Sequence, residues 1–277
     1  MTTLILQGPR LDEAQAGALA QTLEGQSSAG KHCWRITTER TVDRALIRQL
    51  RQAADFDINC LPADFQPAGI RLLISDMDST LINIECVDEI ADFTGRKTEV
   101  AAITAAAMRG EINFESSLQQ RVALLRDIPA AALDQVYRER LRLNPGAETL
   151  LAGLRRHGIK TALVSGGFTV FTQRLQEHLK LDYTLANELE IRDGNLSGRV
   201  SGAIVGARRK ADFLRELCHR LEIETTQAIA VGDGANDLEM MRLAGLSVAY
   251  HAKPAVQAVA DIALNHSGLD AILTLLS

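Results

Sequence analysis

From residue 70 onward, short apolar runs alternate with helical patterns. The runs cover residues 70–75, 159–164, 228–231, 246–249 and 262–264. Each run is too short for an ordinary helix and is bounded by turn-forming residues, which is typical of strands buried on both faces. Strand and helix in alternation predict an α/β fold, a doubly wound, Rossmann-like parallel sheet with helices on both faces.

Two segments depart from this alternation. Residues 83–143 show only helical patterns rich in Ala, Leu and Glu, with breaks near Gly95, Gly110 and Pro129. We therefore predict a helical cap, inserted after the first core strand and lying over the edge of the sheet. Between Glu190 and Val200 the Asp193-Gly194 pair separates two short strand-like pieces, which predicts a β-hairpin.

Residues 1–68 have a pattern of their own. An apolar run at 4–6, a helical pattern at 12–23, a strand-like stretch at 32–36 and a helical segment at 43–54 predict a small α+β domain of order β-α-β-α. A proline-containing stretch at 61–69 follows and is a plausible linker. We expect a boundary near residue 68, with a second domain over 69–277.

Composition excludes several classes of protein. Hydrophobic residues make up 46% of the chain, and 30 basic against 35 acidic residues leave a net charge of 30 − 35 = −5. This composition argues against disorder and offers no basic stripe for nucleic acid. No signal peptide or apolar stretch of membrane-spanning length is present, and the four cysteines are scattered without a CxxC pair. We expect a cytoplasmic protein with reduced thiols and with neither a membrane nor a nucleic acid as partner.

Four polar clusters mark the candidate site, three of them directly after predicted strands. They are Asp76-Met-Asp78-Ser-Thr80, Ser165-Gly166-Gly167, Lys210 at the start of a helical pattern, and Gly232-Asp233-Gly-Ala-Asn236-Asp237. Taken alone, each is more often a helix cap, a turn or a solvated charge. Ligands of doubly wound sheets bind at the carboxyl ends of the strands, and the convergence of the clusters there favours function.

The residue types suit a phosphate site. Carboxylates bind Mg²⁺, glycine amides and a serine hydroxyl donate to phosphate oxygens, and lysine adds positive charge. Other phosphate and metal motifs fail. Leu81 and Val87 stand where an EF-hand requires Gly and Glu, Ile159-Lys160 stands where a P-loop requires Lys-Ser/Thr, and no GxGxxG follows the first core strand.

The motifs resemble those of a known protein superfamily. Asp76-Met-Asp78-Ser-Thr80 resembles the DxDxT signature of the haloacid dehalogenase (HAD) superfamily, and Ser165, Lys210 and the 232–237 cluster resemble its later motifs in the right order. The resemblance covers residues 70–277. Within it, Ile84-Glu85, Met108-Arg-Gly110, Asn113-Phe114-Glu115-Ser-Ser-Leu118, Arg121-Val122 and Val164-Ser165-Gly166-Gly167-Phe168 are similar to the phosphoserine phosphatases of that superfamily.

The resemblance implies roles for the core residues. Asp76 is expected to be the nucleophile that forms an aspartyl-phosphate, and Asp78 the general acid and base. It implies Mg²⁺ held by the Asp76 carboxylate, the Asp78 carbonyl and Asp233, with Asp237 in support. The resemblance assigns the phosphoryl oxygens to Ser165, Gly166 and Lys210, with Asn236 also at the substrate.

It also implies what the cap does. Glu85 is expected to bind the substrate ammonium and Arg121 the carboxylate, while Met108 and Phe114 form an apolar lid. Apart from the resemblance, an exposed helix charge and ordinary cap packing remain the simpler interpretations of these four residues. The six histidines are not expected to take part in catalysis.

The expected reaction is Mg²⁺-dependent hydrolysis of O-phospho-L-serine, the last step of serine biosynthesis, with this small molecule as the partner. Two alternatives stay open: a phosphotransferase that passes the phosphate to another alcohol such as homoserine, and an amino-acid-binding regulatory protein. The N-terminal segment is compatible with a shortened ACT-like domain, and with a homodimer formed through it.

Overall fold

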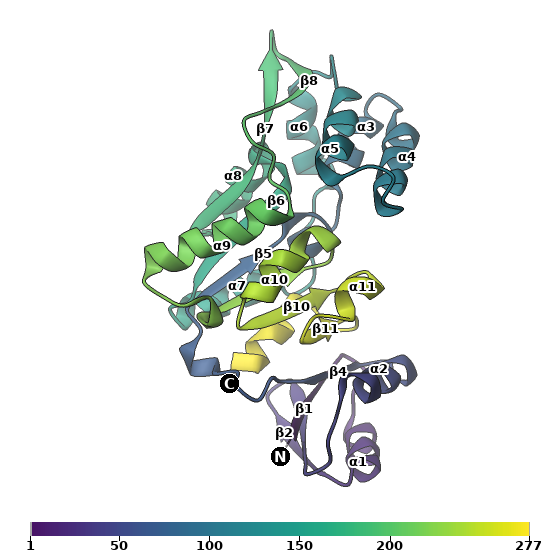
Figure 1. Cartoon of the computed structure of the whole chain (residues 1–277), viewed down its shortest axis with the longest axis vertical. Coiled ribbons are helices and arrows are strands. Elements are labelled where there is room, and N and C mark those ends of the chain that lie inside the picture. Colours follow the sequence, from purple (N-terminus) through teal and green to yellow (C-terminus); the bar gives the residue numbers. More distant parts are fainter. Residues whose placement is uncertain (1, 277) are drawn as a thin grey trace.

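Three parts follow one another along the long axis of the molecule (Figure 1). The computed structural model describes residues 2–276, without the side chain of Met108. The N-terminal domain lies at one end, the central sheet in the middle and the cap helices at the other end. No helix within residues 2–276 is long and apolar enough to cross a membrane. All four cysteines are free thiols, as predicted.

The central sheet has the predicted doubly wound topology. Its strands are β5 (Leu72–Ser75), β6 (Lys160–Phe168), β7 (Tyr183–Arg192), β8 (Asn195–Ser201), β9 (Ala228–Gly232), β10 (Leu246–Tyr250) and β11 (Ile262–Leu264). The order is β11-β10-β9-β5-β6-β7-β8, and only β8 runs antiparallel, as the second arm of a hairpin with β7. The chain winds away from β5 on both sides, so the ends of β5, β6 and β9 meet at the point where ligands bind in such sheets.

Both faces of the sheet are buried, which explains the unbroken apolar runs. On one face Leu73 packs in a cluster with α7 (Ala147–Arg156) and α8 (Thr169–Leu179). On the other, Leu72 and Ile74 pack with α9 (Ala207–Leu221) and α10 (Leu238–Leu243). The remaining helical pieces of this part are η1 (Pro67–Gly69), η2 (Met77–Leu81), η4 (Thr225–Gln227), η5 (Ala235–Asp237), α11 (Pro254–Gln257) and η6 (Leu269–Leu276).

The cap is a helical excursion that leaves and rejoins the core at one place. Ile82 and Leu143 form an isolated antiparallel bridge, and between them lie α3 (Cys86–Asp92), α4 (Lys97–Met108), α5 (Phe114–Ala123), α6 (Ala131–Gln135) and η3 (Val136–Arg140). The side chain of Asn113 caps α5 by accepting from the amide of Ser116 at 2.8 Å. The β7–β8 hairpin extends beyond the sheet beside these helices and supports the cap (Figure 1).

The N-terminal domain corrects one prediction. Its order is β-α-β-β-α-β rather than β-α-β-α, with β1 (Thr2–Gln7), α1 (Glu13–Thr22), β2 (Gln26–Gly30), β3 (Cys33–Thr38), α2 (Arg44–Ala53) and β4 (Asp57–Cys60). The antiparallel sheet order β2-β3-β1-β4 is that of a complete ferredoxin-like unit. The pattern missed β2 because all five of its residues are exposed, and β4 because its four residues include buried Asp57 and Asn59.

Buried polar side chains of β4 join this domain to the core. The Asp57 carboxylate accepts hydrogen bonds from the backbone amides of Asn265, His266 and Ser267, at 2.7 to 3.1 Å for the shortest contact of each. Asn59 accepts from the amide of Ala263 at 2.8 Å and donates to its carbonyl at 3.1 Å. Because β4 thereby pairs its polar groups with the segment around β11, the two domains are held in a defined orientation.

Candidate active site

A cavity of about 400 Å³ lies between the carboxyl ends of the strands and the cap. Asp76 follows β5 directly, and the chain then turns through Ser79, whose φ of 56° is left-handed. This turn brings Asp78 to the same cavity as Asp76. The other core residues at the cavity that the sequence singled out are Gly166, Gly167, Asp233 and Asn236.

Lys210 binds the nucleophile candidate directly. Its ammonium nitrogen lies 2.7 Å from Asp76 Oδ1 and 2.7 Å from Asp237 Oδ1, and its side chain is completely buried. Burial lowers the pKa of Lys210, but Asp237 and Asp76 more than offset this and hold the pKa above its usual range. Lys210 is therefore a fixed positive charge beside Asp76.

The surroundings of Asp76 disfavour the ionised form of its carboxyl group. Burial raises its pKa, Asp237 and Asp233 raise it further, and Lys210 opposes them. One lysine does not compensate for burial together with the neighbouring acids, so the pKa of Asp76 stays well above its ordinary value. A further cation would favour the ionised, nucleophilic form of Asp76.

Asp78 is set up differently from Asp76. Its Oδ1 accepts from the Cys86 amide at 3.0 Å, and its Oδ2 accepts from the Ser165 hydroxyl at 3.3 Å. Burial, followed by the charge of Glu85, raises the pKa of Asp78 to about 7. A carboxyl that holds a proton near neutral pH can both donate and accept one, which is what a general acid and base requires.

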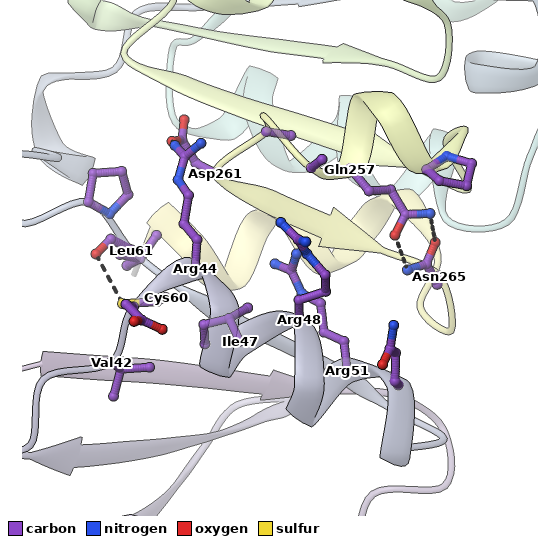
Figure 2. A pocket seen from close by; sticks show the side chains of 16 residues that line it. Val42, Arg44, Ile47, Arg48, Arg51, Cys60, Leu61, Gln257, Asp261 and Asn265 are labelled. Carbon is purple, nitrogen blue, oxygen red and sulfur yellow. Dashed lines mark hydrogen bonds and ion pairs between the residues drawn. The ribbon is translucent and has the colours of Figure 1, made fainter.

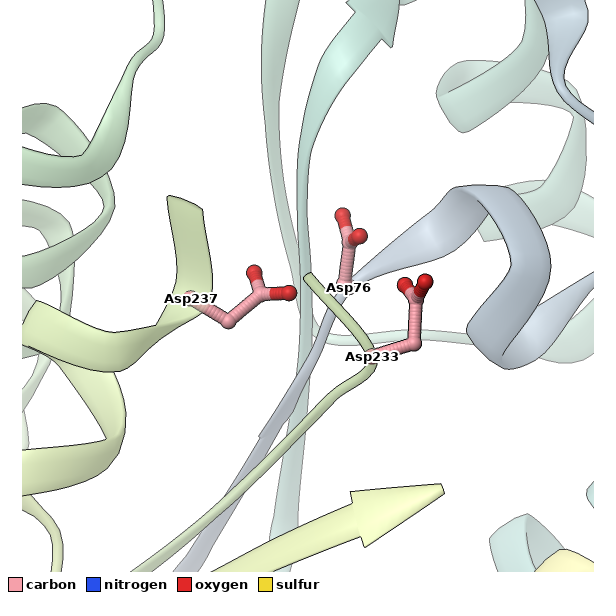
Figure 3. A group of neighbouring side chains, drawn as sticks. All are labelled: Asp76, Asp233 and Asp237. Atoms are coloured by element: carbon pink, nitrogen blue, oxygen red, sulfur yellow. The ribbon is translucent and has the colours of Figure 1, made fainter. Parts of the chain in front are cut away.

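Three carboxylates at the site form a group suited to a cation (Figure 3). One oxygen from each of Asp76, Asp233 and Asp237 lies within 4.8 Å of the others. Asp233 accepts from Thr80 Oγ1 at 3.2 Å, and burial followed by Asp237 raises its pKa to about 6. Oxygen donors of this kind fit a hard divalent ion such as Mg²⁺.

The carboxylate group differs from the predicted metal set at one member. The side chain of Asp78 points to Cys86 and Ser165 and is not a member of this group, and the use of its carbonyl oxygen stays a prediction. Asp237 supplies the third carboxylate, but it already accepts from Lys210 and, at 3.0 Å, from the Gly234 amide. Asp237 therefore holds Lys210 and the loop in place, and Asp76 and Asp233 are the freer donors.

Gly166 and Gly167, near the end of β6, lie where a side chain would collide with its neighbours. A Cβ on Gly166 would lie 2.8 Å from Cζ of Phe114, and one on Gly167 would lie 2.6 Å from Oδ2 of Asp78. Ser165 is buried rather than at the cavity wall, and its hydroxyl accepts from the Gly167 amide at 2.8 Å. Ser165 therefore fixes the end of β6 and the carboxyl of Asp78.

The cap closes the cavity with Glu85, Phe114 and Arg121. Glu85 accepts from the hydroxyl of Ser79 at 2.7 Å, which ties the start of the cap to the core. Burial lowers the pKa of Arg121, while Asp88 and Glu85 oppose this. The side chain of Met108 lies outside the described residues. The site thus combines a carboxyl and a guanidinium group of the cap, from Glu85 and Arg121, with the carboxyl groups of the core.

Some residues at the site were not anticipated from the sequence. Ser117 and Lys253 line the cavity, and the buried hydroxyl of Ser117 has no hydrogen-bond partner among the described residues. Asn187 donates to the Gly166 carbonyl at 2.7 Å and accepts from the Val205 amide at 2.8 Å. Ser117 belongs to the 113–118 motif, which the sequence singled out without giving this serine a role of its own. Lys253 could have been suspected from its place after a predicted strand, whereas Asn187 carries no local signal.

Comparison with known proteins gives a consistent result. Residues 73–242 match the model of the haloacid dehalogenase-like hydrolases. A phosphoserine phosphatase of a Polaromonas species is 55% identical over 79% of this chain and 94% of that protein. One from Haemophilus influenzae is 47% identical over 80% of this chain and 71% of that protein.

Solved structures extend the likeness to the fold. A HAD family hydrolase from Salmonella enterica has a TM-score of 0.90 at 33% identity, covering 100% of this chain and 99% of that one. A phosphoserine phosphatase solved as a phospho-aspartyl intermediate analogue has a TM-score of 0.71 at 39% identity, covering 75% of this chain and 99% of that one. The chain therefore belongs to the haloacid dehalogenase-like hydrolases, among the phosphoserine phosphatases.

Proposed function

We propose that this enzyme hydrolyses O-phospho-L-serine to L-serine and phosphate through an aspartyl-phosphate on Asp76. One observation carries the proposal: a single cavity brings the acids Asp76, Asp78 and Asp233 of the core together with Glu85 and Arg121 of the cap. The core acids suit phosphoryl transfer, and the two cap charges suit the ammonium and carboxylate of an amino acid. The relative trapped as a phospho-aspartyl analogue supports the same chemistry.

In the first step a carboxylate oxygen of Asp76 bonds to phosphorus as the bond from phosphorus to the seryl oxygen breaks. Asp78 gives its proton to that leaving oxygen, consistent with its pKa of about 7. In the second step Asp78 takes a proton from water, which attacks phosphorus and releases Asp76 and phosphate. Each proton lost by Asp78 in the first step is regained in the second, so the site returns to its starting state.

Lys210 and the end of β6 hold the reacting groups. Lys210 stays protonated between Asp76 and Asp237, so it orients the nucleophile and adds positive charge beside the phosphoryl group. Gly166 lies at the cavity, and Ser165 positions Asp78 from behind. Asn236 lines the cavity, and in this proposal it contacts the phosphate.

We assign a Mg²⁺ site to Asp76, Asp233 and the carbonyl of Asp78, with Asp237 behind them. When bound, the ion would neutralise phosphate charge and favour the ionised form of the carboxylates. The donor chemistry fits, because the carboxylate oxygens converge within 4.8 Å and burial raises the pKa values of Asp76 and Asp233.

A panel of phosphorylated metabolites, assayed with Mg²⁺ and with chelator, tests the proposal. We expect release of phosphate from phosphoserine only with the metal, and slower release from phosphothreonine. Adding homoserine and analysing products by mass spectrometry separates hydrolysis from phosphotransfer, because only the latter makes a phosphorylated acceptor. Absence of any Mg²⁺-dependent phosphate release would contradict both and leave an amino-acid-binding regulatory protein.

The wider assignments rest on this activity. Formation of serine from phosphoserine would end a biosynthetic route to serine in the cytoplasm. The complete ferredoxin-like unit supports an ACT-like role for residues 1–68, as a domain separate from the phosphatase core at 69–277. We propose a homodimer through this domain; sedimentation equilibrium of the full chain and of residues 69–277 would test it.

A further inference from the structure

A second cavity lies at the junction of the N-terminal domain and the core (Figure 2). Its volume is about 480 Å³, and none of the residues lining it is shared with the active-site cavity. The N-terminal domain contributes α2 and the end of β4, and the core contributes α11 and the segment up to Asn265. The size is that of pockets for small organic molecules.

Three arginines of α2 line this cavity. Arg44, Arg48 and Arg51 are spaced at four and three residues, so they lie along one face of the helix, and all three reach the same space. Like charges at this spacing repel each other and destabilise an isolated helix. An anion in the cavity would relieve this repulsion.

The acids around the cavity are already engaged. Asp43 caps α2 by accepting from the Leu46 amide at 2.8 Å. Asp261 accepts from the amide and hydroxyl of Ser247 and lies 3.6 Å from Arg44. Within residues 2–276, no carboxylate lies within ion-pairing distance of Arg48 or Arg51.

Arg51 is held by neutral groups only. Its Nε donates to the Ile58 carbonyl at 2.8 Å, and a terminal nitrogen donates to Oδ1 of Asn59 at 2.5 Å. Burial lowers the pKa of this guanidinium, although Asp57 opposes the shift. The exposed Arg48 has no hydrogen bond or ion pair among the described residues, and it stands one turn away on the same face. Two guanidinium groups therefore line one cavity, and neither forms an ion pair with a carboxylate among the described residues.

We propose that this cavity binds a small organic oxyanion, a carboxylate or a phosphate ester, through Arg48 and Arg51. Guanidinium groups bind such oxyanions through paired N–H donors. Ile47 and Leu61 provide apolar walls for the body of the ligand. On the core side Gln257 and Asn265 hold each other by two amide hydrogen bonds of 3.0 and 3.1 Å, as Figure 2 shows, and present polar edges to the ligand.

The cavity has a short connection to the active site. Pro254, Gln257 and Ala258, from α11 and its end, line the new cavity, whereas Lys253, the residue before α11, lines the active-site cavity. The Lys253 amide donates to the Asp233 carbonyl at 3.2 Å. A ligand held between α2 and α11 would thus fix the element that also bounds the catalytic acids.

Protection of Cys60 is a local test of the site. Cys60 lines the cavity and is half-buried, whereas Cys33, Cys86 and Cys218 are buried. The full-length protein is treated with iodoacetamide, and alkylation of Cys60 is followed by peptide mass spectrometry with malonate or inorganic phosphate as probe. We expect at least one probe to slow labelling several-fold. The two arms distinguish a carboxylate site from a phosphate site, and neither depends on phosphatase activity.

Variants decide whether the arginines are responsible. Replacing Arg48→Gln removes an exposed side chain, so the fold should be retained, and calorimetry should show about tenfold weaker binding of the protecting probe. Arg48→Lys should be intermediate, because it keeps the charge and loses the paired donors. Arg10→Gln, an exposed arginine of the same domain away from the cavity, is the control and should match wild type. Unslowed labelling with both probes, or equal protection in Arg48→Gln, would overturn the proposal.

Discussion

The buried ammonium of Lys210 lies 2.7 Å from Oδ1 of Asp76, and the same ammonium also binds Asp237. Because Lys210 has this second carboxylate, loss of the charge on Asp76 does not leave it unpaired. Asp76→Asn should therefore keep the fold while lowering kcat by roughly 10³-fold or more, since an amide is a poor nucleophile. Turnover is measured by phosphate release.

Asp237→Asn is the matched comparison, because it removes the other partner of Lys210 and spares the nucleophile. It should reduce activity less than Asp76→Asn does. Near-normal turnover of a folded Asp76→Asn protein, checked by circular dichroism, would remove Asp76 from the nucleophile role.

The protonation of Asp78 predicts a pH-dependent stability. Burial and Glu85 raise its folded pKa to about 7, above the ordinary value of about 3.9. The folded state therefore binds the proton more tightly, and this contribution is present below about pH 4 and lost as pH rises through about 7. In metal-free protein, Asp78→Asn should flatten the fall in the urea midpoint between these values.

The wild type and Asp78→Asn are best compared at low and at high pH. Near pH 4 the wild type and Asp78→Asn should have similar midpoints, because the side chain is uncharged in both. At pH 8 the variant should be the more stable of the two. Parallel curves over the whole range would show that Asp78 is not held protonated by burial.

The carboxylates of Asp76 and Asp233 predict that Mg²⁺ stabilises the folded protein. Since burial raises the pKa values of Asp76 and Asp233, Mg²⁺ competes with protons there, and it should raise Tm more at pH 8 than at pH 5. Asp233→Asn should remove most of this effect. Differential scanning fluorimetry with and without Mg²⁺ measures it, with Asp193→Asn at the exposed hairpin turn as control. A Tm insensitive to Mg²⁺ at both pH values would contradict the site.

A structural element can be predicted from the sequence when neighbouring residues determine it, and not when its partners lie far away in the chain. The strand before Asp76 is apolar on both faces, so its pattern alone marks it as β5, and the acid that follows lies at the sheet edge by topology. In contrast, the sequence pattern predicts β7 only near its hairpin, because Tyr183–Asn187 mixes polar and half-buried residues. Asp57 and Asn59 are paired with residues about 200 positions away, and no local pattern shows such partners.

Selectivity for an amino-acid substrate should depend on Arg121. Its guanidinium is largely buried at the cavity, and a bidentate contact to a carboxylate requires the planar fork. Arg121→Lys should raise KM for phosphoserine by about tenfold, the effect of losing roughly 1.4 kcal/mol. It should change KM for p-nitrophenyl phosphate little, because that substrate has no carboxylate. Arg138→Lys, at an exposed cap position, serves as control; equal shifts for both substrates would argue against carboxylate recognition.

The space beside Gly167 gives a final prediction. A methyl group there would lie 2.6 Å from Oδ2 of Asp78 and 3.0 Å from the Ser165 hydroxyl, so the carboxyl would have to move. Displacement of a catalytic group by about 1 Å can cost about 10²-fold in rate, and Gly167→Ala should lower kcat by that order.

Substitutions at two other glycines serve as comparisons for Gly167→Ala. Gly166→Ala would push only the ring end of Phe114, 2.8 Å away, and should be milder because that side chain can turn. Gly17→Ala, in α1 with nothing within 4 Å of the added carbon, should leave kcat unchanged and slightly raise Tm, since alanine favours helix. If Gly167→Ala kept full kcat, the close approach of the end of β6 to Asp78 would not govern the position of the acid, and the proton transfer proposed for Asp78 would lose its structural basis.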